Sequence, residues 1–103
     1  MLAERAEVAR SLRARLRGLI GRSPLGPGEA LVIERCPQVH TFFMGYPIDV
    51  VFCASDWTVL HVVRALPPRR LSRWVSKARY AVELPAGSLP AGLCPGDRLE
   101  AQP

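Results

Sequence analysis

The side chains best suited to chemistry interrupt an apolar stretch, Val39–Phe52, with the sequence VHTFFMGYPIDVVF. Asp49 stands between Ile48 and Val50, and a buried carboxylate without a partner costs too much free energy to be tolerated. The structural interpretation is that Asp49 accepts hydrogen bonds from backbone amides of the turn at Gly45–Pro47. The functional interpretation is that its carboxylate lies at the lip of a pocket as a binding group.

Five more residues complete the candidate ligand-binding set. His40 and Thr41, together with Phe42 and Met44, could line a cleft with both polar and aromatic walls, a common composition for small-ligand sites. The fifth, Glu83, comes from a second apolar stretch, YAVEL. The alternation of a strand favours a Glu83 that faces outward and is solvated.

Glu83 acquires a chemical role only if it faces inward. It could then pair with Arg64 or Arg79, or it could join Asp49. Two convergent carboxylates could carry out acid–base catalysis or hold a cation. An enzyme built on Asp49 with Glu83 or His40 is therefore an alternative to simple binding.

Cysteine and histidine usage predicts no metal and no cofactor. Cys36, Cys53 and Cys94 are odd in number and share no metal-ligand spacing, and no second histidine stands at such a spacing from His40 or His61. The nucleophile elbow, the phosphate-binding glycine loop and the dinucleotide fingerprint are missing from the sequence. Free cysteines indicate a reducing compartment. With no signal peptide or membrane-length apolar run, we expect a cytoplasmic protein.

The chain is basic, with fourteen Lys and Arg against nine Asp and Glu. The segment Arg69–Arg79, RRLSRWVSKAR, holds five cations and no anion. Binding to nucleic acid would need these cations on one face together with several aromatic residues, and only Trp74 and Tyr80 are near in the sequence. Because charge runs are usually solvated surface, an anionic partner is the less favoured interpretation.

The elements that must position these residues are one helix and several short strands. Residues 2–20 repeat apolar side chains at spacings of three and four, which predicts an amphipathic helix; Ser11 could instead cap a shorter helix that begins at Leu12. Apolar runs bounded by Gly and Pro predict strands at 30–34, 39–44, 48–54, 57–66, 80–84 and 97–102.

This order of elements predicts one α+β domain, mostly β, over residues 1–103. Strands without intervening helices argue against a βαβ fold and favour a small, barrel-like curled sheet with the N-terminal amphipathic helix packed on it. Continuous apolar runs at Ile48–Ala54 and Trp57–Val63 predict central strands covered on both faces.

A series of short blocks, in order, resembles the domain of unknown function 192 family of bacteria and archaea. The blocks are RLRGLIGR (15–22), GEALVI (28–33), HTFFMGYPIDVVF (40–52), YAVELPAG (80–87) and LCPGDRLE (93–100). The resemblance implies a compact, mostly β, barrel-like domain, with no established activity or ligand. The chain departs from the family pattern at Gly45, where relatives usually carry a basic or polar residue.

The leading hypothesis is a non-enzymatic ligand-binding or accessory module with its site near the central turn. Its partner would be a small molecule or a protein, and the oligomeric state is left open. The alternatives are a small hydrolase or isomerase that uses Asp49 with Glu83 or His40, and an anionic-partner (nucleic acid) binder that uses Arg69–Arg79.

Overall fold

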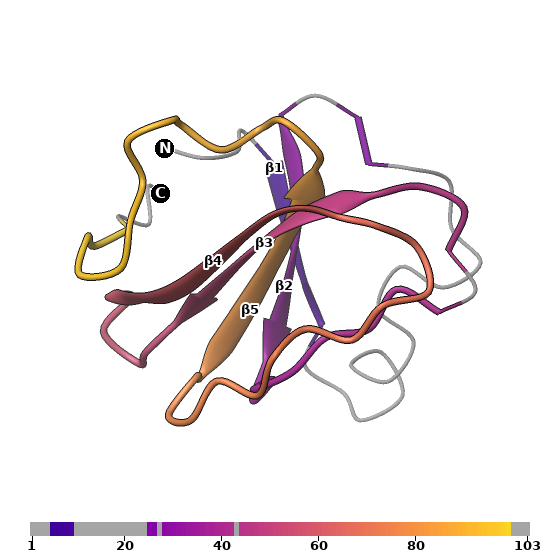
Figure 1. Cartoon of the computed structure of the whole chain (residues 1–103). Coiled ribbons are helices and arrows are strands. Elements are labelled where there is room, and N and C mark those ends of the chain that lie inside the picture. The colour runs from indigo at the N-terminus through magenta and orange to yellow at the C-terminus, as the bar shows by residue number, and fades with distance from the viewer. Residues whose placement is uncertain (1–4, 10–24, 27, 43, 100–103) are drawn as a thin grey trace.

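The computed structural model describes residues 5–9, 25–26, 28–42 and 44–99. They form one five-stranded sheet with the order β1-β2-β5-β3-β4 (Figure 1). The β1–β2 pair is parallel, and the other neighbouring pairs are antiparallel. The strands are β1 (Arg5–Ala9), β2 (Glu29–Glu34), β3 (Ile48–Cys53), β4 (Val59–Leu66) and β5 (Tyr80–Pro85).

The strand β3 lies in the interior of the sheet, where it pairs with β5 on one side and with β4 on the other. All six of its residues are buried, which confirms the central strand that the apolar run predicted. The prediction of a second central strand is wrong, because β4 ends the strand order and most of its side chains are half-buried or exposed. The strands β3 and β4 have a similar content of apolar and β-branched residues, so composition alone could not show which of them lies at the edge of the sheet.

Each face of the sheet has its own core. Leu31, Val50 and Phe52 belong to the core on one face, and Val32, Val51 and Val82 belong to the core on the other. The alternation of each strand sends neighbouring residues to opposite faces, so a strand apolar throughout can serve both cores.

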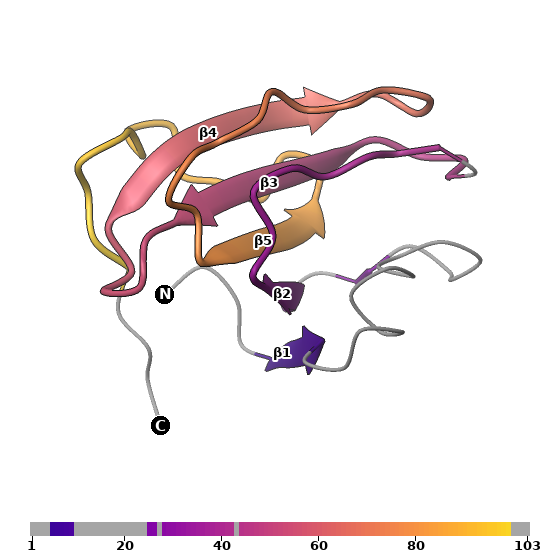
Figure 2. The same ribbon diagram turned by 90° about the horizontal axis from the view of Figure 1, so that it is seen from below.

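Two segments, residues 35–42 and 67–79, are named here the loop pair. Seen from below in Figure 2, they pass in front of the sheet, and Val39 and Val75 contribute to the core beneath them. The amide of Thr41 donates to the Arg70 carbonyl at 2.9 Å, and the amide of Ser72 donates to the Val39 carbonyl at 2.9 Å. The loop pair is therefore a bonded layer over one face of the sheet.

The predicted strand 39–44 is wrong as a regular strand. Among residues 39–42 and 44, which the structure describes, only His40 makes a ladder bridge, to Leu71, and the surrounding bonds are irregular. Pro37, Pro67 and Pro68 supply no amide donors to this region. The predicted strand 97–102 is reduced to a bridge between Thr58 and Arg98 within the described residues.

The predicted barrel-like closure does not form. The sheet is open, because β1 and β4 lie at opposite ends of its strand order. Arg5–Ala9, inside the helix predicted over residues 2–20, is a strand that pairs with β2. Pairing with a neighbouring strand outweighs the helical spacing of these five residues. The rest of that predicted helix, residues 2–4 and 10–20, lies outside the described residues. The described residues contain no helix that is long and apolar enough to cross a membrane.

Replacing Phe52 by Ala tests the central position of β3. Phe52 is fully buried, so we expect the free energy of unfolding to fall by about 3–5 kcal/mol. The matched control is Phe42→Ala on the loop pair, where the side chain is 40% exposed and the expected loss is about 1 kcal/mol or less. Urea unfolding of both variants measures the difference. Equal losses would contradict the described core.

Candidate functional site

Asp49 is a buried carboxylate that binds three backbone amides. Its Oδ1 accepts from the Ala65 amide at 2.8 Å, and its Oδ2 accepts from the amides of Gly87 at 3.0 Å and Leu89 at 3.2 Å. Asp49 is 1% exposed. The structural interpretation named the right kind of partner but the wrong place, because the amides come from β4 and the segment after β5 instead of from Gly45–Pro47.

The bonds of Asp49 coincide with an irregularity in the sheet. The β3–β4 register shifts between Ile48 and Val50, and Ala65 opposite it has a φ of 51°, in the left-handed region. A non-glycine residue in that region is strained, and a carboxylate that binds its amide stabilises the conformation. Asp49 therefore acts as a structural clamp on this corner of the sheet.

Arg64, next to Ala65 within the same register shift, binds the same C-terminal segment. Its guanidinium donates to the carbonyls of Leu89 at 3.2 Å and Pro90 at 2.7 Å. Carboxylate and guanidinium thus bind amides and carbonyls of one loop, so the polar groups of Asp49 and Arg64 serve the fold.

Glu83 and Asp49 lie on opposite faces of the sheet. Across the β3–β5 pair, Asp49 stands opposite Leu84, and Glu83 stands opposite Val50. Neighbouring positions alternate between faces, so the two carboxylates cannot converge on one substrate. The sheet therefore does not bring Asp49 and Glu83 together into the two-carboxylate site that the enzyme alternative considered.

Glu83 is buried, so the prediction that it faces solvent is wrong. The strand β5 lies between β2 and β3, and both of its faces are covered. Alternation assigns residues to faces, but it does not reveal that the second face is covered as well.

Thr41 and Met44 are used by the fold. Thr41 is fully buried; its Oγ1 donates to the Pro67 carbonyl at 2.5 Å and accepts from the Arg70 amide at 2.9 Å. Met44 is part of the core under the loop pair. Thr41 therefore joins the two segments of the loop pair to each other, and Met44 packs in the core beneath them.

His40 and Phe42 are brought together on the outer side of the loop pair. Their ring centroids are 5.7 Å apart. His61, the other histidine, is half-buried as predicted and lies against Phe52 at 6.2 Å. Burial and then the charge of Arg73 lower the pKa of His61, which favours its neutral form.

Cysteine chemistry and a metal site find no support in the described part of the chain. Burial, and then the charge of Asp56, raises the pKa of the Cys53 thiol to about 12, so Cys53 is an inert core residue as predicted. Among residues 5–9, 25–26, 28–42 and 44–99, no three His, Cys, Asp or Glu side chains are grouped to hold a metal ion.

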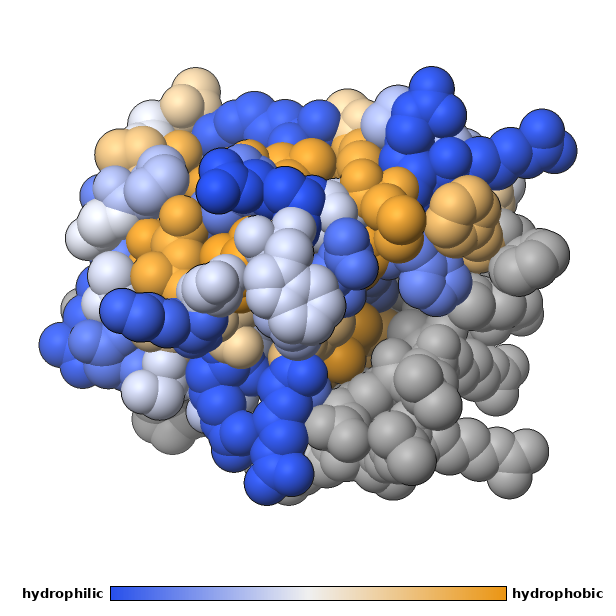
Figure 3. All heavy atoms as spheres, turned by 60° about the horizontal axis from the view of Figure 1, so that its bottom comes forward, coloured by the Kyte–Doolittle hydropathy of each residue, from blue (hydrophilic) through white to orange (hydrophobic). Residues whose placement is uncertain are grey.

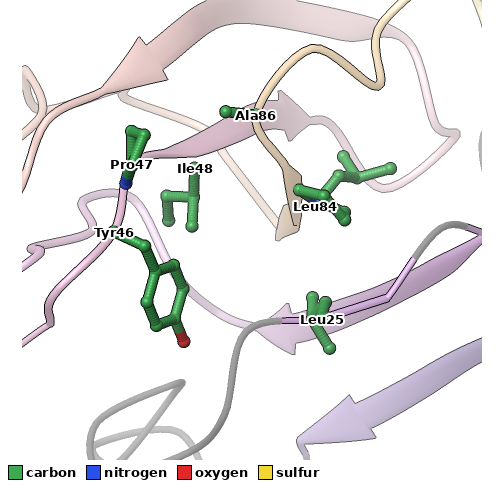
Figure 4. Close-up of a pocket in the computed structure, with 7 residues that line it drawn as sticks. Leu25, Tyr46, Pro47, Ile48, Leu84 and Ala86 are labelled. Carbon is green, nitrogen blue, oxygen red and sulfur yellow. The ribbon is translucent and has the colours of Figure 1, made fainter.

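A small hollow lies beside the central turn (Figure 4). It encloses about 150 Å³ between the start of β3 and the end of β5. Figure 4 shows the Tyr46 ring and the Ile48 side chain on one side, with Leu25 and Leu84 across from them. The described lining residues are Leu25, Tyr46, Pro47, Ile48, Leu84, Pro85 and Ala86.

The hollow lies where the sequence placed a site, but with different residues. None of the six candidates, His40, Thr41, Phe42, Met44, Asp49 and Glu83, lines it. Most of the lining comes from the start of β3, the end of β5 and their adjoining turns, which meet because Ile48 pairs with Pro85. Leu25 comes from the segment before β2. Each turn was visible in the sequence, whereas the register that joins them was not.

Comparison with known proteins gives the family. The family model described as "Uncharacterized ACR", DUF192, matches residues 2–101. The chain belongs to the DUF192 family. This confirms the resemblance found in the short sequence blocks, and no curated protein matches the chain.

Two solved structures share the DUF192 chain's fold, each with a TM-score of 0.78. One is a protein of unknown function from Novosphingobium aromaticivorans DSM 12444, with 23% identity over 93% of this chain and 74% of that one. The other is described as a putative transcription regulator from Sinorhizobium meliloti 1021, with 29% identity over 92% of this chain and 79% of that one.

Asp49→Asn tests the structural clamp. An asparagine amide keeps one acceptor oxygen and turns an NH₂ group toward amide donors, so we expect the free energy of unfolding to fall by about 2–4 kcal/mol. Asp56→Asn is the matched control, since Asp56 is exposed and accepts a hydrogen bond from the Thr58 amide at 3.0 Å. Thermal and urea unfolding measure both variants. If Asp49→Asn left the free energy of unfolding unchanged, the Asp49 carboxylate would not be a structural clamp.

Thiol labelling tests the assigned state of the cysteines. Iodoacetamide at pH 8 should modify exposed Cys94 and leave Cys53 unmodified, because a pKa near 12 leaves almost no thiolate and the side chain is buried. Peptide mass spectrometry locates the label. Labelling of Cys53 should appear only in denaturant, and fast labelling in the native protein would contradict its core position.

Proposed function

We propose that this DUF192 protein is a non-enzymatic binding module whose site is the hollow beside the central turn. The observation that carries the proposal is an apolar recess formed by two turns that meet at the Ile48–Pro85 pair. Pockets of this kind, lined by apolar side chains with few polar groups, are the usual form of small-ligand sites.

The size and chemistry of the hollow indicate the class of ligand. A volume of about 150 Å³ is well below that of a drug-sized pocket and suits a group of about the size of benzene. Tyr46 brings a phenol, and the other described lining residues are apolar. The ligand is therefore a small aromatic or aliphatic molecule.

The described lining favours binding over catalysis. It contains no carboxylate, imidazole or thiol, which are the usual groups for proton transfer and nucleophilic attack. Asp49, the centre of the enzyme alternative, already accepts three backbone amides. These observations support a recess that holds a ligand without transforming it.

Thermal shift with a panel of small aromatic and aliphatic molecules tests this function. A ligand at about ten times its dissociation constant stabilises by about 1.4 kcal/mol, which is a rise in Tm of about 6–11 °C in a domain of this size. Methyl NMR should show the shifts at Ile48 and Leu84.

Ala86→Trp supplies the decisive comparison. Ala86 lines the hollow and is exposed, so a tryptophan there should fill the recess and abolish the thermal shift. Ala91→Trp adds the same side chain at an exposed position outside the lining and should leave the shift intact. A hit that survives in Ala86→Trp, or a panel without hits, would overturn the proposal.

A further inference from the structure

The loop pair is strongly basic. It carries Arg35 together with the five cations of Arg69–Arg79 and no acidic residue. The remaining residues of the chain hold eight Lys and Arg against nine Asp and Glu. The six cations of the loop pair are therefore not offset by any acid within it, and an anionic partner would be drawn to this layer.

Alternation gives the loop pair an inner and an outer side. Val39, Thr41 and Ser72 are buried toward the sheet, whereas Phe42 and Leu71 are exposed. The bridge between His40 and Leu71 joins the outer positions of the two loops. The outer side is thus a continuous surface held by the same bonds that cover the core.

Three large apolar side chains are exposed on this surface. Phe42 is 40% exposed, Leu71 57% and Trp74 61%. Exposed arginines at 69, 70 and 73 are interleaved with them along the second loop. Figure 3 shows this side of the molecule, where hydrophilic and hydrophobic side chains alternate across the surface.

Few aromatic residues lie near the basic segment Arg69–Arg79 in the sequence, but the fold brings further aromatic residues next to this segment. Phe42 and His40, some thirty residues away in the chain, lie beside the Arg69–Trp74 segment because Thr41 is hydrogen-bonded to Arg70. We propose that the outer side of the loop pair binds single-stranded nucleic acid. Arginines would contact phosphates, and Trp74 and Phe42 would stack on bases.

The interleaving of charge favours a nucleic acid strand over an anionic membrane. Insertion of Leu71 and Trp74 into a bilayer would carry Arg70 and Arg73, which flank them, toward the hydrocarbon, where a charge is costly. A single strand presents phosphates and bases in alternation, so it matches mixed cations and aromatic rings. Five of the six cations are arginine, whose planar guanidinium group can donate two hydrogen bonds to a phosphate and can also stack on an aromatic ring.

Fluorescence anisotropy with a fluorescein-labelled oligothymidine strand tests the inference. Because single strands lose affinity with a slope of about 0.7 per phosphate contact, three arginine contacts predict a weakening of about twentyfold between 50 and 200 mM salt. A duplex of the same length should bind more weakly, since its bases are already stacked. Equal binding of duplex and single strand would overturn the stacking role.

Matched variants distinguish binding at the loop pair from nonspecific attraction to the positive charge of the protein. Arg73→Ala should reduce the salt slope by about 0.7, whereas Arg98→Ala, which removes the same charge from an exposed site outside the loop pair, should leave it unchanged. Trp74→Ala should weaken binding about five- to hundredfold, and Trp74→Tyr should restore much of it. Identical effects of Arg73→Ala and Arg98→Ala would overturn the proposal.

Two further results would also overturn it. One is no binding of the strand at 50 mM salt. The other is Trp74-dependent co-sedimentation with phosphatidylglycerol vesicles in place of strand binding, which would assign the surface to membranes. Ala86→Trp, which blocks the hollow, should not change strand binding, because the two surfaces share no residue.

Discussion

The fold depends on one buried carboxylate. Asp49 lies on the interior strand β3, and its two oxygens accept hydrogen bonds from an amide of β4 and from two amides that follow β5. The charge is compensated by directed backbone dipoles, which is how a buried carboxylate becomes tolerable. In return, the carboxylate fixes the register shift in the sheet and the path of the chain after β5. The hollow beside the central turn lies at the same corner of the sheet, because Ile48, next to Asp49, and its partner Pro85 both line the hollow.

Local chemistry made some of the structure predictable. The strands β2, β3 and β5 follow from apolar runs bounded by Gly and Pro, within a residue or two of their ends. The burial of Cys53 and of Asp49 follows from their apolar neighbours. These features depend on a few consecutive residues, so the sequence contains their causes.

Other features depend on pairings between distant segments. Arg5–Ala9 has helical spacing, but it pairs with β2. Glu83 was assigned to solvent because nothing in YAVEL reveals that β5 lies between two strands. Thr41 and Met44 were expected to line a cleft. In the structure, Thr41 is hydrogen-bonded to Pro67 of the second loop, and Met44 packs in the core beneath the loop pair. The sequence directed attention to the central turn, beside which the hollow lies, but the residues that line the hollow depend on the β3–β5 register.

The strand order also governs how the protein can be made. The last strand, β5, lies between β2 and β3, so these two strands have no common neighbour until residues 80–85 exist. During synthesis, four-fifths of the chain therefore leaves the ribosome with two apolar strand edges unpaired, a state prone to aggregation. The sheet cannot be completed until β5 has been synthesised, and a truncation before β5 would divide the sheet in two instead of leaving a smaller domain. The presence of residues 80–85 is therefore a condition of folding as well as of stability.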